Sequence, residues 1–118
     1  MAKKKKEQRL LDVQTPYTAA PTVTIFASVW EKHVVPSHPE LFGRIEDVQR
    51  TLESPTAICA ATNPTTNLAF VNHNVTINGD PLVAYVNPNH GLGPNSLSTA
   101  YPDERYADLS KVTVLWKP

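Results

Sequence analysis

The second half of the chain consists of short β-prone segments separated by turn signals, and this pattern constrains its fold most strongly. Segments rich in β-branched, aromatic and small apolar residues recur at 56–62, 68–72, 81–87, 97–101 and 111–116. Asn-Pro, Asn-Gly and Gly-Pro pairs, which favour tight turns, stand between them. Connections as short as residues 63–67 suit antiparallel hairpins, because parallel crossovers need about a dozen residues or more. The pattern predicts an antiparallel sheet of four or five strands.

Two short helices are expected ahead of this sheet, and the first follows a β-branched segment at residues 22–26 that indicates a short edge strand. Ser28 and Glu31 have the spacing of a capping box, so we expect a helix to begin at Val29. Pro36 lacks an amide donor and disfavours helical geometry at the preceding residue. The first helix should therefore end before Pro36, after one or two turns.

The second helix has the clearer pattern. Ser37 and Glu40 repeat the capping-box spacing, and Ser54 with Pro55 provides a stop signal. Between them, an aliphatic stripe with helical spacing is formed by Leu41, Ile45, Val48 and Leu52. We expect this stripe to cover one face of the sheet. The predicted fold class is α+β, with two short N-terminal helices packed on a four- to five-stranded antiparallel sheet.

Length and charge indicate one domain preceded by a basic tail. A chain of 118 residues has room for one compact core. Residues 1–21 contain the lysine run Lys3 to Lys6 and two prolines, and they are expected to form a flexible tail or linker before a single domain at 22–118. From Leu10 onward, six Lys and Arg face ten Asp and Glu. This acidic body disfavours non-specific nucleic-acid binding except through the tail.

Other sequence features indicate a cytoplasmic protein with an inert thiol. No apolar run approaches the roughly 20 residues that cross a bilayer, and no secretory signal follows the lysine run. Cytoplasmic residence without membrane association is therefore expected. Cys59 is the only cysteine, and it stands inside an apolar segment. We expect a buried, unreactive thiol there.

The candidate chemistry lies at the junction between the two predicted helices. His33 and His38 stand on either side of Pro36, and two imidazoles at the edge of a cleft can act as general base and general acid. Taken singly, each histidine is more commonly a packing or turn residue. The four histidines are scattered and lack the paired spacing of a metal site, so no metal and no other cofactor is expected.

Three stretches carry a family resemblance. They are Trp30-Glu31-Lys32-His33, Ser37-His38-Pro39-Glu40-Leu41, and the run from Val48 to Pro55 that leads to Ile58. Together they resemble the phage-encoded branch of the BECR ribonuclease superfamily, which joins barnase-like, colicin-type and RelE-type nucleases. The late Thr99-Ala100-Tyr101-Pro102 resembles a late-strand motif of the same superfamily. The resemblance extends over about residues 24–116.

The resemblance implies helices followed by a four-stranded antiparallel sheet, and cleavage of RNA without metal. The catalytic positions it implies are His33, His38, Thr99 and Tyr101. Contacts to the substrate are expected from Lys32, Arg44, His73 and Ser98. Two features depart from the family pattern: Ser37 stands where a basic residue is usual, and the body is acidic.

Three functions remain open from sequence. The first is a metal-independent endoribonuclease of phage or toxin type, acting on RNA such as tRNA or mRNA in a host cytoplasm and held by a protein inhibitor. The second is a catalytically degenerate binding or structural module, in a virion or in a protein complex with a phage structural partner. The third makes the lysine tail a nucleic-acid arm on a structural domain.

Overall fold

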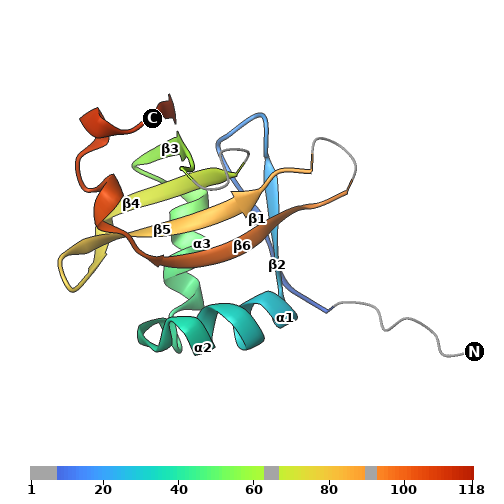
Figure 1. Ribbon diagram of the computed structural model, residues 1–118. Helices are drawn as coiled ribbons and strands as arrows, with labels where there is room; N and C mark the ends of the chain where they lie inside the picture. Colours follow the sequence, from blue (N-terminus) through green and yellow to red (C-terminus); the bar gives the residue numbers. More distant parts are fainter. Residues whose placement is uncertain (1–7, 63–66, 90–92) are drawn as a thin grey trace, which may run out of the picture.

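The computed structural model describes residues 8–62, 67–89 and 93–118, and its centre is a seven-stranded sheet (Figure 1). The strands are β1 Arg9–Gln14, β2 Thr22–Phe26, β3 Ala57–Ala60, β4 Leu68–Ile77, β5 Asp80–Asn87, β6 Asn95–Pro102 and β7 Val114–Trp116. Their order across the sheet is β1-β2-β6-β5-β4-β3-β7. β2 and β6 run parallel, whereas the other pairs are antiparallel. The expectation of a purely antiparallel sheet of four or five strands is therefore wrong.

The strand that sequence reasoning missed is β1, which lies inside the segment expected to be a tail. It pairs with β2 in antiparallel register, and Val13 is buried opposite Val23. The Thr24 hydroxyl donates to Asp12 Oδ1 across the pair, at 2.6 Å. The polar residues of β1 obscure its strand pattern, but Val13 is in the core, Leu10 and Leu11 pack against it, and the strand pairs with β2. The folded part of the chain thus begins well before residue 22.

The parallel contact between β2 and β6 is short. It joins Val23 with Asn95 and Thr24 with Ser96. Beyond that point, the edge of β6 faces the helical segment that follows β2 (Figure 1). This arrangement brings the predicted helix junction beside the later half of β6.

The β4–β5 hairpin confirms the Asn-Gly turn signal. Asn78 and Gly79 connect the two strands with φ angles of 54° and 87°. A two-residue turn of type I′ needs positive φ at both central positions, which Asn and Gly tolerate best. The expected turns at 63–67 and 91–94 fall mainly on residues 63–66 and 91–92, outside the described residues.

The first helical segment continues past Pro36, contrary to the expected break. It consists of α1 Ala27–Val29, the π-helical η1 Trp30–Val34 and α2 Val35–Ser37. The amide of Val35 donates to the carbonyl of Trp30, five residues back. The hydrogen bonds therefore change from the α-helical to the π-helical pattern just before Pro36. A widened π turn absorbs the missing donor of the proline. The segment also starts earlier than expected, with Phe26 rather than Ser28 at its N-cap.

The second predicted helix is divided in two. A single 3₁₀ turn, η2 Pro39–Leu41, comes first, and α3 Ile45–Glu53 follows. Gly43 separates them with a φ of 74°, a left-handed conformation that ends regular helix. α3 ends at Ser54, as the Ser-Pro signal predicted, and packs its buried Val48 and Leu52 onto the sheet. The aliphatic stripe therefore covers the sheet as expected.

The sheet carries a core on each face. One core lies under α3 and includes Phe70, Leu82 and Ala84. The other includes Val71 and Tyr85, and the C-terminal segment with η3 Glu104–Tyr106 and η4 Leu109–Lys111 packs on it. Among the described residues, no helix is long and apolar enough to cross a membrane.

Candidate functional site

The most distinctive contact on the surface joins the helix junction to β6. His38 is the first residue after α2, and its backbone leaves helical geometry with φ −135° and ψ 75°. Its half-buried imidazole stacks on the phenol ring of Tyr101, with centroids 4.7 Å apart and planes inclined by 22°. Stacking occupies the face of the imidazole, whereas its two nitrogens lie in the ring plane. The contact therefore orients His38 without using the atoms that exchange protons.

A β-bulge decides which way Tyr101 points. The register with β5 shifts between Leu97 and Thr99, so Ser98 is an extra residue in β6. Leu97 consequently joins the core under α3, whereas Thr99 and Tyr101 lie on the opposite face. Strict alternation along β6 would place Leu97 on the same face as Thr99 and Tyr101, with Ser98 opposite. The bulge inserts one residue into this alternation and so puts Leu97 on the other face.

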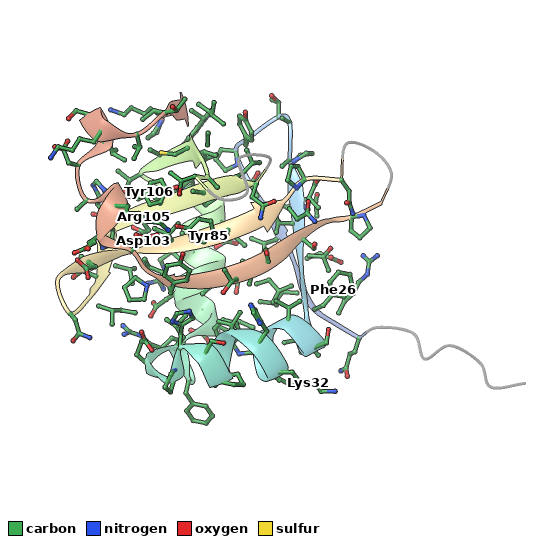
Figure 2. All side chains as sticks on the ribbon, viewed as in Figure 1. Phe26, Lys32, Tyr85, Asp103, Arg105 and Tyr106 are labelled. Atoms are coloured by element: carbon green, nitrogen blue, oxygen red, sulfur yellow. The ribbon has the colours of Figure 1, made fainter. Side chains whose placement is uncertain are left out.

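The phenol of Tyr101 belongs to a hydrogen-bonded cluster at the end of β6. Arg105 Nη2 donates to Tyr101 Oη at 3.2 Å and to Asp103 Oδ2 at 2.8 Å. Arg105 Nε donates to Asp103 Oδ1 at 3.1 Å, which completes a bidentate pair. The Tyr85 hydroxyl donates to the same carboxylate, and its ring stacks on Tyr101 at 5.2 Å. We call His38, Tyr85, Tyr101, Asp103 and Arg105 the aromatic corner; Figure 2 shows its Tyr85, Asp103 and Arg105 together.

Burial and charge set the ionisation of this corner. Asp103 is only 5% exposed, and burial by itself would raise its pKa. Hydrogen bonds from Arg105 and Tyr85 outweigh burial, so the pKa of Asp103 lies below its ordinary value of 3.8. The hydrogen bond with Asp103 raises the pKa of Arg105. The pKa of Tyr85 is also raised, mainly by burial and secondly by its hydrogen bond to Asp103. The corner thus holds one carboxylate and one guanidinium as a fixed ion pair.

Thr99 lies on β6 and His33 on the helical segment beside it, and among the described residues neither side chain forms a hydrogen bond or ring contact with the corner. Thr99 pairs with Tyr85 across the β5–β6 ladder and shares the face of Tyr101. His33 is exposed on η1, the turn that packs beside β6. Among the described residues, no hydrogen bond or ring contact joins His33 to His38. Of the four residues expected to be catalytic, the structure brings only His38 and Tyr101 into direct contact.

The residues expected to contact substrate are dispersed. Lys32 is exposed on the helical segment, away from Asp103 and Arg105 (Figure 2). Arg44 donates from Nε to Asp47 Oδ2 at 2.9 Å, at the start of α3. Ser98 is the bulge residue of β6. These three residues lie on separate elements, and in the described part of the chain none of them forms a hydrogen bond with the aromatic corner.

His73 has a structural contact of its own. Its Nε2 lies 2.8 Å from the carbonyl oxygen of Tyr106, and its amide donates to the Thr56 hydroxyl. Because a carbonyl only accepts, Nε2 carries the proton in this contact. His73 therefore fastens the C-terminal segment to β4. Tyr106 in turn packs edge-on against Tyr85, at 6.2 Å.

Sequence reasoning missed Asp103, Arg105 and Tyr85. A local signal existed for the first two, because an Asp two residues before an Arg, just after a β-strand, suits a turn in which the carboxylate caps the next amide. Asp103 Oδ1 does accept from the amide of Arg105 at 3.0 Å. Tyr85 gave no such signal, because it stands inside an apolar strand and meets Asp103 only through the fold.

The comparisons with known proteins leave the chemistry to be inferred from this geometry. Among the described residues, no three His, Cys, Asp or Glu side chains are grouped so that they could hold a metal ion. No protein-family model matches the chain, and no curated protein or solved structure was found to match it either. Function must therefore be argued from the side chains of the aromatic corner.

Proposed function

We propose that this protein is a metal-independent endoribonuclease whose reaction centre is the aromatic corner. The observation that carries the proposal is the His38–Tyr101 stack, with the Tyr101 hydroxyl held by Arg105. It joins an imidazole, a phenol and a guanidinium at one place on the surface. These are the three kinds of group that phosphodiester cleavage in RNA requires: a base, a proton donor and a cation.

The roles follow from the chemistry of each group. The imidazole of His38 takes the proton of the ribose 2′-hydroxyl, and the 2′-oxygen then attacks the adjacent phosphorus. The bond from phosphorus to the 5′-oxygen breaks, and that oxygen takes a proton from the Tyr101 hydroxyl, leaving a cyclic phosphate. Arg105 carries a permanent positive charge and stabilises the negative charge that develops on the phosphorus oxygens.

The other positions are assigned supporting roles. Thr99 shares the face of Tyr101 and supplies a second hydroxyl, and His33 supplies a second imidazole from the turn beside β6. Lys32, Arg44, His73 and Ser98 are assigned to contacts with the RNA strand away from the scissile bond. The resemblance to phage and toxin nucleases makes tRNA or mRNA the substrate. On the same resemblance, we propose a protein inhibitor as a partner. We place the protein in the host cytoplasm or in the virion.

The decisive experiment compares His38→Ala and His33→Ala with the wild-type protein on a fluorescent RNA oligonucleotide. We expect His38→Ala to reduce kcat/KM by about 10²- to 10⁴-fold, as is usual for the loss of a general base. The control is Glu40→Gln, an exposed change in the same turn that leaves the imidazole in place. Parallel purification of all variants, with circular dichroism as a check on folding, removes the influence of contaminating nuclease. Equal cleavage by wild type and a folded His38→Ala would refute the proposal.

A non-catalytic interaction module is the second candidate, and two observations favour it. Arg105 is already hydrogen-bonded to Asp103, Thr62 and Tyr101, as a purely structural arginine would be. The chain from Leu10 onward is also acidic. Salt dependence separates the two functions, because affinity for a phosphate backbone falls steeply as salt rises. An interaction module would bind RNA weakly at every salt concentration.

A further inference from the structure

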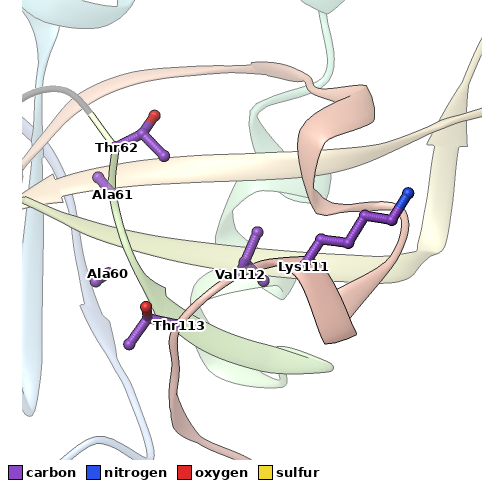
Figure 3. A pocket seen from close by; sticks show the side chains of 6 residues that line it. All are labelled: Ala60, Ala61, Thr62, Lys111, Val112 and Thr113. Atoms are coloured by element: carbon purple, nitrogen blue, oxygen red, sulfur yellow. The ribbon is translucent and has the colours of Figure 1, made fainter.

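The sheet face opposite α3 is covered over only part of its width. The second core lies on this face under η3 and η4, and among the described residues no side chain of β1 or β2 belongs to it. A hollow of about 350 Å³ at the end of β3 lies in the covered part, and the Lys111 ammonium points away from Thr62 there (Figure 3). No aromatic ring lines this hollow. The surface that is open to a large ligand is therefore the uncovered part, along β2 and β6.

The uncovered part leads from the end of β2 to the aromatic corner. Thr24 of β2 pairs with Ser96 of β6, so these two side chains share one face, and Phe26 follows two residues after Thr24. Thr99 lies on the face of Ser96, since the partners of these two residues in β5 are two positions apart. Tyr101 comes next on the same face. Side chains from Phe26 to Tyr101 thus form one continuous strip.

The far end of this strip is an aromatic ring beneath a guanidinium. Arg9 pairs with Phe26 across the β1–β2 ladder, and its Cζ lies over the Phe26 ring at 5.9 Å from the centroid. Both side chains reach solvent, because the Arg9 side chain is 54% exposed and Phe26 is half-buried. We call Arg9, Phe26, Ser96 and Thr99 the open strip, and Arg9 with Phe26 its clamp.

The clamp can open without loss of its anchor. Arg9 donates to Asp12 Oδ1 at 3.4 Å, a long contact between two half-exposed side chains, and such surface pairs contribute little to stability. The same Asp12 oxygen accepts a much shorter bond of 2.6 Å from the buried Thr24 hydroxyl. The carboxylate therefore stays in place when the guanidinium moves.

An unpaired nucleobase matches the clamp. Two stacked contacts of ~3.5 Å each require a separation of ~7 Å, which is about 1 Å more than the clamp has now. Bases that are splayed out of a single strand stack on aromatic rings and on guanidinium planes, whereas bases inside a duplex expose no such face. Stacking uses the plane of Arg9 rather than an unpaired charge. The contact of Arg9 with Asp12 is thus compatible with binding.

We propose that the open strip binds single-stranded RNA, with one unpaired base held between Phe26 and Arg9. The Ser96 and Thr99 hydroxyls donate to bases or ribose oxygens of the nucleotides between the clamp and the reaction centre. This assignment rests on the proposed ribonuclease function and adds the class of substrate, a single strand rather than a duplex. Binding at the clamp lowers KM and leaves the chemistry at His38 unchanged.

The helical segment sets the distance between the clamp and the reaction centre. It begins directly after Phe26 and ends directly before His38, and Figure 2 shows Phe26 on the opposite side of the view from Asp103 and Arg105. At about 1.5 Å per residue, residues 27–37 extend over about 16 Å. At about 3.4 Å per stacked nucleotide this corresponds to about five nucleotides. The base in the clamp is therefore several positions away from the scissile phosphate.

The test measures binding of the full-length protein to a ten-residue RNA of mixed sequence, by fluorescence anisotropy. All its 2′-hydroxyls are methylated, so no 2′-oxygen can attack and the strand stays intact. Phe26→Leu keeps an apolar side chain and removes the ring, and we expect it to weaken binding about tenfold. Phe42→Leu, the same change at the strongly exposed Phe42, should leave the affinity unchanged. An unchanged affinity of Phe26→Leu, or equal losses in both variants, would refute the clamp.

A second pair of variants keeps the charge and removes the guanidinium plane. Arg9→Lys should weaken binding about threefold or more, whereas Arg50→Lys on the exposed face of α3 should not change it. Wild-type affinity of Arg9→Lys would overturn the stacking of a base on Arg9. Phe26→Tyr retains a ring and should bind as the wild type does, and circular dichroism checks that every variant is folded.

A third measurement needs no variant. Titration of the ¹⁵N-labelled wild-type protein with the same methylated RNA should shift the amides of residues 9, 26, 96 and 99 most strongly. Shifts confined to other residues would remove the strip as the binding surface. Because no cleavage is involved, the two proposals fail separately. Binding at the clamp by a protein that cleaves no RNA would refute only the ribonuclease function, and cleavage with no effect of Phe26→Leu on binding would refute only the clamp.

Discussion

The imidazole of His38 stacks on the ring of Tyr101, and this contact joins the helix junction to the late half of β6. Tyr101 stacks in turn on Tyr85, so the three rings form one continuous stack from the protein surface into the core. Aromatic pairs of this kind contribute about 0.5–1.5 kcal/mol beyond the area they bury. The position of His38 is thus set by the sheet and not by the helix alone.

Substitutions at Tyr101 distinguish the contribution of its ring, which stacks on His38, from that of its hydroxyl, which accepts from Arg105. Tyr101→Phe keeps the stack on His38 and removes the hydroxyl that Arg105 binds. We expect kcat/KM for an RNA oligonucleotide to fall by about 10²-fold or more, because the proposed proton donor is lost. The kcat/KM of Tyr101→Ala should be lower still, since this substitution also removes the ring on which His38 stacks. Tyr17→Phe, the same change in the turn after β1, is the control, and unchanged cleavage by Tyr101→Phe would exclude the phenol as the acid.

Asp103→Asn should destabilise the fold. The substitution removes the charge that binds Arg105 and weakens the acceptor of the Tyr85 hydroxyl, in a side chain that is almost fully buried. We expect the free energy of unfolding in urea to fall by about 1–3 kcal/mol. Asp108→Asn, in the exposed turn nearby, should change it much less. Equal effects of the two substitutions would show that the bonds of Asp103 contribute no more than those of a surface carboxylate.

The stabilisation by Asp103 should depend on pH with a definite sign. Its folded-state pKa is below the ordinary value of 3.8, so the folded state holds the ionised form more strongly than the unfolded chain does. The contribution is complete above that ordinary value and is lost as pH falls through the lower folded-state pKa. The difference in unfolding free energy between wild type and Asp103→Asn should therefore be constant from pH 5 to 7 and shrink below about pH 4. Urea unfolding across this range measures it, and a difference that grows on acidification would contradict the assignment.

Cys59 should be inert in the folded protein. It is fully buried, as the sequence predicted, and burial raises the pKa of its thiol to about 11. The thiolate is the reactive form, so at pH 8 we expect a thiol reagent to react at least about 10²-fold more slowly with the folded protein than with the protein in urea. Absorbance of the released chromophore follows the reaction. Stoichiometric labelling within seconds under native conditions would show that the strand opens readily.

Several parts of the fold could be predicted because they depend on neighbours in the chain. β2 covers the expected residues 22–26, and the Asn78-Gly79 hairpin has the φ angles its composition demands. α3 ends at Ser54 and buries its aliphatic stripe. In each case local conformational preference and hydrophobic period agree with the tertiary contacts. The sequence pattern alone is therefore sufficient to predict the element.

The candidate site could be predicted only in part. His38 and Tyr101 were identified from the helix junction and the late strand, and the fold brings them into contact. Arg105 and Asp103 were not identified, because their role depends on Tyr85 from a different strand. The π turn before Pro36 could not be predicted from the sequence either. Local preference alone would end the helix at the proline, whereas packing of the helical segment on β6 compensates for it.

The sequence by itself determined the β-prone segments, the hairpin turn at Asn78 and the buried face of α3, because these follow from backbone preferences and hydrophobic period over a few residues. Only the tertiary structure decided that β1 joins the sheet, that β2 runs parallel to β6, and that the bulge at Ser98 turns Tyr101 toward His38. These features depend on pairing between distant segments. Hydrogen bonds and burial across the sheet set that pairing, and no local pattern in the chain records it.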